Sequence, residues 1–384
     1  MIIAIDLTAV GSTGTMGYSS GFILALEGLD HENKFIIFCS TEAYQLFQYS
    51  LDKDRFKVIA ILSAKKVFRR IIFGQLILPF LLLKYKVNVL FSAFDIAPLM
   101  SPCPVLLGAR NPLPILLKNG YFSKNNYLIK VRANIHNALT LFSSRVASKI
   151  IYPTRYAAVA IGSALKIPEN KQLVVHHGID RKFWSGDTSC KAHFARLGVT
   201  PNEYILFVSE FYPYKNPQFL INEFSLYLKK GQCKNTKLVM VGKIPDPEFS
   251  DYLNRLVIDL KIEEHVIFPG HITKDELRSL YRNAALFALP SEMETFGFPY
   301  IEAMLSGAPI IAADKEFARE LCGEAALYCS LEIEGSMSRL ISVILNDYDV
   351  RDKLIRFANS RSKDFSWELE AGETLRAILN IHDH

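Results

Sequence analysis

The chain has 384 residues, of which half are hydrophobic, and it carries a formal net charge of +5 at pH 7. A chain of this length predicts about two domains, each large enough to bury its own core. The six cysteines are scattered without a CxxC pair, which argues against a disulfide framework and a zinc site. No recognised nucleic-acid-binding motif accompanies the positive charge, so we expect no nucleic-acid partner.

The charge is unevenly distributed along the chain. Residues 1–170 contain 19 Lys and Arg against 9 Asp and Glu, whereas the remainder contains 25 against 30. A basic first half suits an acidic partner, such as anionic lipid headgroups or a phosphate-bearing acceptor. An ordinary solvated surface shows the same excess, and the sequence leaves both interpretations open. The first residues lack the basic and cleavage regions of a signal peptide, so we expect a cytoplasmic protein.

The chain begins with a short apolar strand at residues 2–6. A segment rich in Gly, Ser and Thr follows at residues 8–18, and an amphipathic helix then extends to about Glu27. A strand, a glycine loop and a helix in this order form a phosphate-binding arrangement, with Gly14 and Gly17 as the candidate contacts. The glycine spacing does not match GxGxxG, so a tight turn is the alternative interpretation.

Residues 65–86 are the most apolar segment of the first half. They contain a run of about 13 apolar residues that includes Pro79, too short for a transmembrane helix, which needs ~20. Because Lys and Arg flank the run, it is either a helix on a membrane surface or a helix packed against the core. Further strands are predicted at residues 34–39, 56–62, 87–91, 104–107 and 149–152.

Arg110 and Asn111 follow the strand at residues 104–107. A guanidinium group binds phosphate or carboxylate through paired hydrogen bonds, so Arg110 is a candidate acceptor contact. Asn111, the next residue, is a second candidate. A strand near residues 171–175 then leads into a Gly-containing turn at residues 178–180, whose composition suits a linker. We therefore predict a domain boundary near residue 180.

The segment from residue 284 to residue 313 carries the strongest functional signal. An apolar run at residues 284–289 predicts a buried strand, and a helix is expected from Pro299 to Gly307, with Glu294 before it and Glu302 in its first turn. Carboxylates accept hydrogen bonds from sugar hydroxyls, and a helix N-terminus offers N–H groups to phosphate. This combination predicts a nucleotide-sugar site. Strands and helices alternate throughout, which indicates doubly wound parallel sheets.

The same segment resembles the retaining glycosyltransferases of family 4. The matching residues are Glu294, Phe296-Gly297-Phe298-Pro299, Glu302-Ala303-Met304 and Gly307-Ala308-Pro309. The resemblance implies the GT-B architecture, in which two Rossmann-like domains face a cleft. It further implies an acceptor-binding domain over residues 1–180, a nucleotide-sugar-binding domain over residues 181–362, and a final helix within residues 363–384 that crosses back to the first domain.

The resemblance also assigns roles to residues of this chain. Glu302 would hold the ribose hydroxyls, Glu294 would contact the sugar, and Lys215 would stabilise the diphosphate leaving group. The remaining donor contacts implied are Phe296, Gly297, Phe298, His271, Gly14 and Gly17. Of these, Phe296 and Gly297 would present backbone N–H groups to sugar or phosphate, and His271 would lie beside the base.

Two positions depart from the family pattern. Glu210 stands where an arginine is usual, and Arg110-Asn111 stands where many members have a histidine. The arginine normally neutralises the donor diphosphate, so the sequence leaves open whether Glu210 weakens activity. His177 also replaces an asparagine that is usual in the family.

The expected function is therefore transfer of a hexose from a nucleotide-diphosphate sugar to a saccharide or lipid-linked saccharide, in cell-surface polysaccharide synthesis. No metal and no cofactor other than the donor sugar nucleotide is expected. The inner membrane face, with its anionic surface, is a candidate location. A nucleotide-sugar epimerase and a non-catalytic nucleotide-sugar-binding protein are the alternatives, and the sequence does not identify sugar, base, acceptor or oligomeric state.

Overall fold

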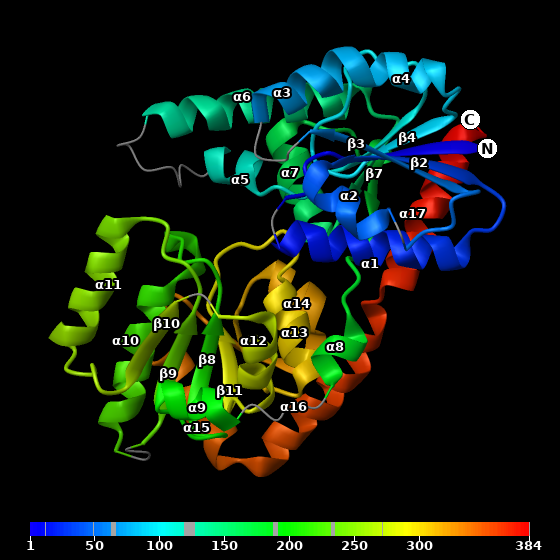
Figure 1. Cartoon of the computed structure of the whole chain (residues 1–384). Coiled ribbons are helices and arrows are strands. Elements are labelled where there is room, and N and C mark those ends of the chain that lie inside the picture. The colour runs from blue at the N-terminus through cyan, green and yellow to red at the C-terminus, as the bar shows by residue number, and fades with distance from the viewer. Residues whose placement is uncertain are drawn as a thin grey trace. The chain divides into compact units, whose positions relative to one another are not determined.

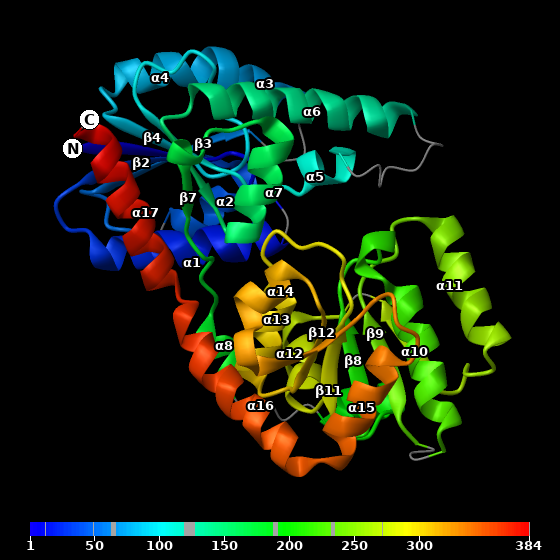
Figure 2. The same cartoon turned by 180° about the vertical axis from the view of Figure 1, so that it is seen from behind.

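The structure, a computed structural model, describes residues 1–11, 13–48, 50–62, 67–118, 127–186, 191–231, 235–270 and 272–383. The chain forms two compact units (Figures 1 and 2). Unit 1 comprises residues 1–180 and 365–384, and unit 2 comprises residues 181–364. Each unit contains one parallel β-sheet flanked by helices, so the predicted doubly wound α/β class is confirmed.

The sheet of unit 1 has the strand order β3-β2-β1-β4-β5-β6-β7, and every neighbouring pair is parallel. The chain builds outward from β1 in one direction and then returns to build outward from β4 in the other. The direction of winding therefore reverses between β1 and β4. The strands are β1 (Ile2–Leu7), β2 (Lys34–Ser40), β3 (Phe56–Leu62), β4 (Val89–Ser92), β5 (Val105–Gly108), β6 (Lys149–Tyr152) and β7 (Gln172–Val174).

Helices cover both faces of this sheet (Figure 1). One face packs against α1 (Thr13–Leu29), α2 (Thr41–Phe47) and α17 (Trp367–His382), whose apolar residues join the strands in one buried cluster. The opposite face packs against α3 (Val67–Ile72), the π-helical turn η1 (Phe73–Ile77), α4 (Leu78–Lys84) and α6 (Tyr127–Val146). The other helices of unit 1 are α5 (Leu113–Lys118), α7 (Arg155–Leu165) and the 3-10 turn η2 (Glu169–Lys171).

The predicted glycine loop after β1 is shorter than expected. Helix α1 begins at Thr13, so Gly14 and Gly17 lie within the helix and the loop prediction is wrong for both. Glycine is a poor helix former, but the buried side chains of Phe22 and Leu26 anchor α1 on the sheet. Whether Gly14 or Gly17 contacts a donor stays a prediction.

The apolar segment after β3 has two different faces. Phe73, Leu78 and Leu82 are buried against the sheet, as a core-packing helix requires, whereas Leu76 and Phe80 are 71% and 65% exposed. The buried face agrees with the core-packing interpretation, whereas contact of the exposed apolar face with a membrane stays a prediction. Among the described residues, no helix is long and apolar enough to cross a membrane.

The sheet of unit 2 has the strand order β10-β9-β8-β11-β12-β13 and is also parallel throughout. The direction of winding reverses here between β8 and β11. The strands are β8 (Tyr204–Val208), β9 (Lys237–Val241), β10 (Val266–Gly270), β11 (Leu286–Leu289), β12 (Ile310–Ala313) and β13 (Ala326–Cys329).

Two helices of unit 2, α11 and α12, illustrate how side chains cap helix N-termini. Thr273 and Glu276 form a capping box at the start of α12, and the Asp246 side chain accepts the N–H of Glu248 at the start of α11. The helical elements are α8 (Arg181–Ser185), α9 (Lys191–Leu197), η3 (Pro213–Lys215), α10 (Pro217–Lys229), α11 (Pro247–Asp259), α12 (Lys274–Arg282), α13 (Phe298–Ser306), α14 (Glu316–Cys322), η4 (Gly323–Ala325), α15 (Ser336–Asn346), α16 (Tyr348–Arg361) and η5 (Ser362–Asp364).

Candidate functional site

The loops that follow β8 and β11 meet at the point where the winding of unit 2 reverses. In open α/β sheets, ligands bind outside the carboxyl ends of the strands at such a point. Hydrogen bonds to main-chain carbonyls join the loops: the Glu292 N–H donates to the Tyr214 carbonyl at 2.8 Å, and the Asn216 amide donates to the Pro290 carbonyl at 3.1 Å. The sheet topology and these bonds therefore fix the two loops side by side.

Lys215 and Glu294 form an ion pair between these loops. The Lys215 Nζ lies 2.5 Å from the Glu294 Oε1, although 79 positions separate the residues in the sequence. Their side chains are 13% and 11% exposed, so the pair is largely shielded from water. Such a pair places a positive charge next to a carboxylate that can accept hydrogen bonds from hydroxyl groups.

Gly297 sets the geometry of the turn between Glu294 and α13. Its φ angle is +95°, and a β-carbon there would lie 2.9 Å from the Tyr300 ring, so only glycine fits. Gly297 is the N-cap of α13 and supplies no side-chain cap. The Tyr300 hydroxyl donates to the Leu289 carbonyl at 2.9 Å, which anchors the helix to β11. Phe296 is buried, and its ring packs edge-on against that of Phe298.

Glu302 lies one residue further into α13 than expected. The helix begins at Phe298, so Glu302 is in the second turn, and the expectation of a first-turn carboxylate is wrong. Burial raises the pKa of Glu302 to about 7, while the Tyr281 hydroxyl and the Lys274 ammonium act in the opposite direction. The Glu302 carboxyl therefore lies beside the Tyr281 hydroxyl and the Lys274 ammonium, which both favour its ionised form.

The loop after β8 contains a feature that the sequence analysis missed. The rings of Tyr212 and Tyr214 stack with centroids 5.5 Å apart and planes 4° from parallel. Tyrosines two positions apart around a proline were the only signal that could have indicated this stack. Glu210, at the start of the same loop, is exposed. The predicted contact His271 lies outside the described residues.

In unit 1, Arg110 belongs to a buried polar cluster. Its guanidinium lies over the Tyr18 ring at 3.7 Å from the centroid, donates to the Tyr18 hydroxyl, and comes within 3.8 Å of the Glu370 carboxylate. His177 Nδ1 lies 2.9 Å from the same carboxylate, and the Gly178 N–H donates to its other oxygen at 2.8 Å. Burial opposes ionisation of Glu370, but His177 and Arg110 hold its pKa below the usual value.

This cluster attaches α17 to the end of β7. The sequence analysis missed Tyr18 and Glu370, because no local motif connects positions so far apart. It did mark His177 as unusual, and the structure provides its partner. The Arg110 side chain is committed to these internal contacts.

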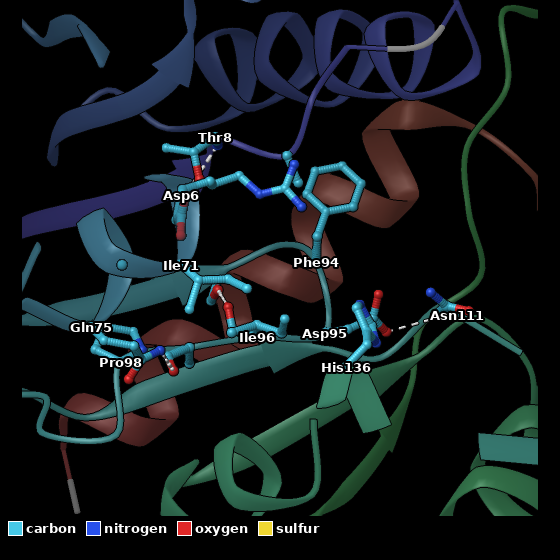
Figure 3. A pocket seen from close by; sticks show the side chains of 15 residues that line it. Asp6, Thr8, Ile71, Gln75, Phe94, Asp95, Ile96, Pro98, Asn111 and His136 are labelled. Carbon is cyan, nitrogen blue, oxygen red and sulfur yellow. Dashed lines mark hydrogen bonds between the residues drawn. The ribbon is translucent and has the colours of Figure 1, made fainter. Parts of the chain in front are cut away.

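Asn111, in contrast, lines a cavity of about 190 Å³ within unit 1. The cavity lies where the winding reverses between β1 and β4, and Figure 3 shows Asp6 and Thr8 on one side and Asp95, Asn111 and His136 on another. The sequence analysis proposed Asn111 but not the two aspartates. Among the described residues, no group of three or more His, Cys, Asp or Glu side chains could hold a metal ion.

Comparison with known proteins supports these observations. Residues 191–361 match the family model described as glycosyl transferases group 1. The chain is 33% identical over 156 residues to the O-antigen chain mannosyltransferase of Salmonella typhimurium, covering 41% of each chain. It is 26% identical over 213 residues to the D-inositol 3-phosphate glycosyltransferase of Corynebacterium glutamicum, covering 54% of this chain and 51% of that one. The chain thus matches about half the length, or less, of these relatives.

The fold is also found in a solved structure, that of Anabaena HepE in complex with UDP and glucose. The TM-score is 0.71 at 17% identity, and the match covers 98% of this chain and 99% of that one. At this identity the likeness concerns the fold, which is the GT-B arrangement of two Rossmann-like domains.

Proposed function

We propose, from the match of residues 191–361 to the family model of glycosyl transferases group 1, that the chain is a retaining, metal-independent glycosyltransferase of family 4. It moves a hexose from a nucleotide-diphosphate sugar to a saccharide acceptor. The observation that carries the proposal is the Lys215–Glu294 pair at the winding reversal of unit 2, with Glu302 on the following helix. The similarity to an O-antigen chain mannosyltransferase supports a role in cell-surface polysaccharide synthesis.

The ion pair suits the departure of a diphosphate. An ammonium group has three N–H donors, so Lys215 can keep its bond to Glu294 while it donates to a phosphate oxygen. Charge that develops on the leaving diphosphate is then stabilised by a cation already held in place. The uncapped start of α13, with the N–H groups of Phe296 and Gly297, supplies further donors to sugar or phosphate.

The two glutamates bind hydroxyl groups in this proposal. Glu294 accepts hydrogen bonds from the hexose, and its fixed position beside Lys215 orients the anomeric carbon for attack by the acceptor. Glu302 accepts hydrogen bonds from the ribose hydroxyls of the donor. The acceptor attacks from the face that the nucleotide leaves, so the anomeric configuration is retained without a covalent sugar–enzyme bond.

Substitution of the ion pair tests the proposal. We expect UDP-, GDP- or other nucleotide sugars to raise the melting temperature of the wild-type protein, because a ligand that binds only the folded state stabilises it. Lys215→Met and Glu294→Gln should each lower kcat/KM for transfer by about 10²–10³, as loss of one electrostatic stabiliser does elsewhere. The exposed residues Lys230 and Glu263 provide matched controls through Lys230→Met and Glu263→Gln.

The outcomes separate the alternatives. Full transfer activity in Lys215→Met would refute the assigned role of the pair. Release of free sugar and nucleotide without an acceptor would instead indicate an epimerase. Binding of nucleotide sugars without any turnover would indicate a binding protein, the alternative that the exposed Glu210 favours. An NMR spectrum of the product that shows an inverted anomeric centre would contradict the retaining mechanism.

We also propose that unit 1 contacts an anionic membrane surface from the cytoplasmic side, where a lipid-linked saccharide would be the acceptor. Two observations support this. Leu76, Phe80 and Leu83 expose apolar surface along η1 and α4. Between residues 55 and 168 the sequence has one acidic residue, Asp95, so little negative charge opposes approach to anionic headgroups.

A further inference from the structure

The cavity of unit 1 has the position of a ligand site. It lies at the carboxyl ends of β1 and β4, where the winding of the sheet reverses. The π-helical turn η1 lines it on one side, and such turns are frequent at functional sites. Its volume of about 190 Å³ lies below the 300–1,000 Å³ of pockets for drug-sized molecules. The space therefore suits one small ring and not an oligosaccharide.

Internal hydrogen bonds hold the walls of the cavity in place. The Gln75 amide donates to the Ala97 carbonyl and accepts the Leu99 N–H, both at 3.0 Å. The Asp95 N–H donates to the Gly108 carbonyl at 2.7 Å, and a β-carbon at Gly108 would lie 2.7 Å from the Ala93 carbonyl oxygen. The loop after β4 is thus fixed from both sides, as a preformed site requires.

Several polar groups on these walls have unused hydrogen-bonding capacity. Asp95 Oδ1 accepts the N–H groups of Arg110 and Asn111, at 2.8 Å and 3.0 Å. Asp6 Oδ1 accepts the N–H and the hydroxyl of Thr8. Within the described residues, neither Asp95 Oδ2 nor Asp6 Oδ2 takes part in any hydrogen bond. Two carboxylate oxygens are therefore left for a ligand.

His136 and Asn111 add groups of the complementary kind. The His136 Nδ1 lies 3.4 Å from the Thr140 hydroxyl, and its Nε2 makes no hydrogen bond in the described part of the chain. The Asn111 side-chain oxygen accepts the Leu113 N–H, which leaves its amide N–H₂ as a donor. Ile71 and Phe94 supply apolar surface on the same lining (Figure 3).

The chemistry of this lining identifies the ligand class. The lining carries the carboxyl groups of Asp6 and Asp95 and the guanidinium of Arg70, whose charge acts on Asp6. The two carboxyl groups outnumber the single guanidinium, so the lining as a whole disfavours a phosphate or carboxylate. A sugar hydroxyl both donates and accepts, so it can bind a carboxylate oxygen and an amide or imidazole N–H at once. The apolar groups match the C–H surface of a sugar ring. A neutral hydroxylated ring therefore fits this lining better than an anion does.

We propose that this cavity binds one neutral, unphosphorylated sugar ring, the terminal residue of the acceptor, through Asp95, Asn111 and His136. The proposal rests on the proposed transferase function and narrows its acceptor. A neutral acceptor differs from the phosphorylated compound in the name of one relative, a D-inositol 3-phosphate glycosyltransferase. It agrees better with the name of another relative, an O-antigen chain mannosyltransferase.

Direct binding measurements test the ligand class. Ligand-observed NMR with the full-length protein would compare mannose, galactose, glucose and N-acetylglucosamine with the corresponding 6-phosphates. We expect at least one neutral sugar to bind, and its 6-phosphate to bind at least tenfold more weakly. Asp95→Asn should weaken binding of the neutral sugar at least tenfold. Asparagine is preferable to alanine here, because Asp95 has a φ angle of +47°, which asparagine tolerates. The exposed Asp54→Asn is the control.

Two results would overturn the proposal: tighter binding of the sugar phosphates than of the neutral sugars, or unchanged sugar binding in both Asp95→Asn and His136→Ala. The increase in melting temperature with nucleotide sugars distinguishes failure of the cavity proposal from failure of the transferase proposal. If Asp95→Asn retains that stabilisation and raises only the KM of the acceptor, the cavity is an acceptor subsite. If transfer proceeds with an unchanged acceptor KM, the cavity proposal fails while the proposed function stands.

Discussion

At the scale of single residues, Glu302 makes ligand binding depend on pH. Because burial raises its pKa to about 7, the carboxyl is fully ionised only above that pH. If the ionised form binds the ribose hydroxyls, donor affinity should fall as the pH drops below about 7, by up to about tenfold per pH unit. Calorimetric titration with the donor nucleotide between about pH 5.5 and about pH 8.5 measures this dependence.

Glu302→Gln is the control for this effect. Glutamine has nearly the same size as glutamate but carries no charge. At high pH the Glu302→Gln variant should therefore bind the donor more weakly than the wild-type protein does. Its donor affinity should not fall as the pH drops below about 7. The unliganded wild-type protein should show the opposite trend in stability. Its folded state binds the Glu302 proton more tightly than the unfolded state, so this contribution to stability is lost as the pH rises towards about 7. An unaltered pH profile of donor affinity in Glu302→Gln would exclude the assigned ribose contact.

At the scale of elements, the attachment of α17 depends on one buried carboxylate. Glu370 interacts with His177, Arg110 and the Gly178 N–H, so Glu370→Gln leaves buried positive and polar groups without their partner. Removing one member of a buried ion pair costs about 3–5 kcal/mol of unfolding free energy. We expect a lower midpoint in urea denaturation, whereas Glu368→Gln, on the exposed side of the same helix, should have little effect.

Because the attachment of α17 depends on ionised Glu370, it should weaken at low pH. Because the pKa of Glu370 is held below its ordinary value, its contribution to stability is present at neutral pH and is lost as the pH falls below the usual glutamate range. Wild-type protein should therefore lose more stability on acidification than Glu370→Gln does. Equal acid sensitivity of the two proteins would show that the carboxylate does not stabilise the helix.

At the scale of the whole molecule, the distribution of charge and apolar surface predicts binding to anionic vesicles. We expect the protein to co-sediment with vesicles that contain phosphatidylglycerol, less with pure phosphatidylcholine, and less again at high salt, because screening weakens the attraction. Phe80→Ser should weaken binding about tenfold or more, since burial of a large apolar side chain is worth ~1.5–3 kcal/mol. Ile333→Ser, at an exposed apolar position of unit 2, is the control. Equal binding to both lipids would exclude an electrostatic contribution.

Much of this fold was predictable because buried parallel strands produce short apolar runs that stand out in the sequence. β13 and α2 were missed, and the seven residues of α2 are too few to establish a helical period. The meeting of Lys215 with Glu294 was implied by a family motif. The cavity lined by Asp6 and Asp95 was not, because each aspartate is a single polar residue at the end of a strand, and only the order of strands in the sheet brings them together.

One consequence follows from the return of α17 to unit 1. The first unit is discontinuous in the chain, whereas residues 181–364 form an uninterrupted insertion in it. During synthesis, the inserted unit therefore leaves the ribosome complete before the first unit has received its last helix. Apolar residues of unit 1 that pack against Ala371 and Ile378 stay uncovered until then. We thus expect the nascent chain to finish its second unit first and to be most vulnerable to aggregation and proteolysis while α17 has yet to emerge.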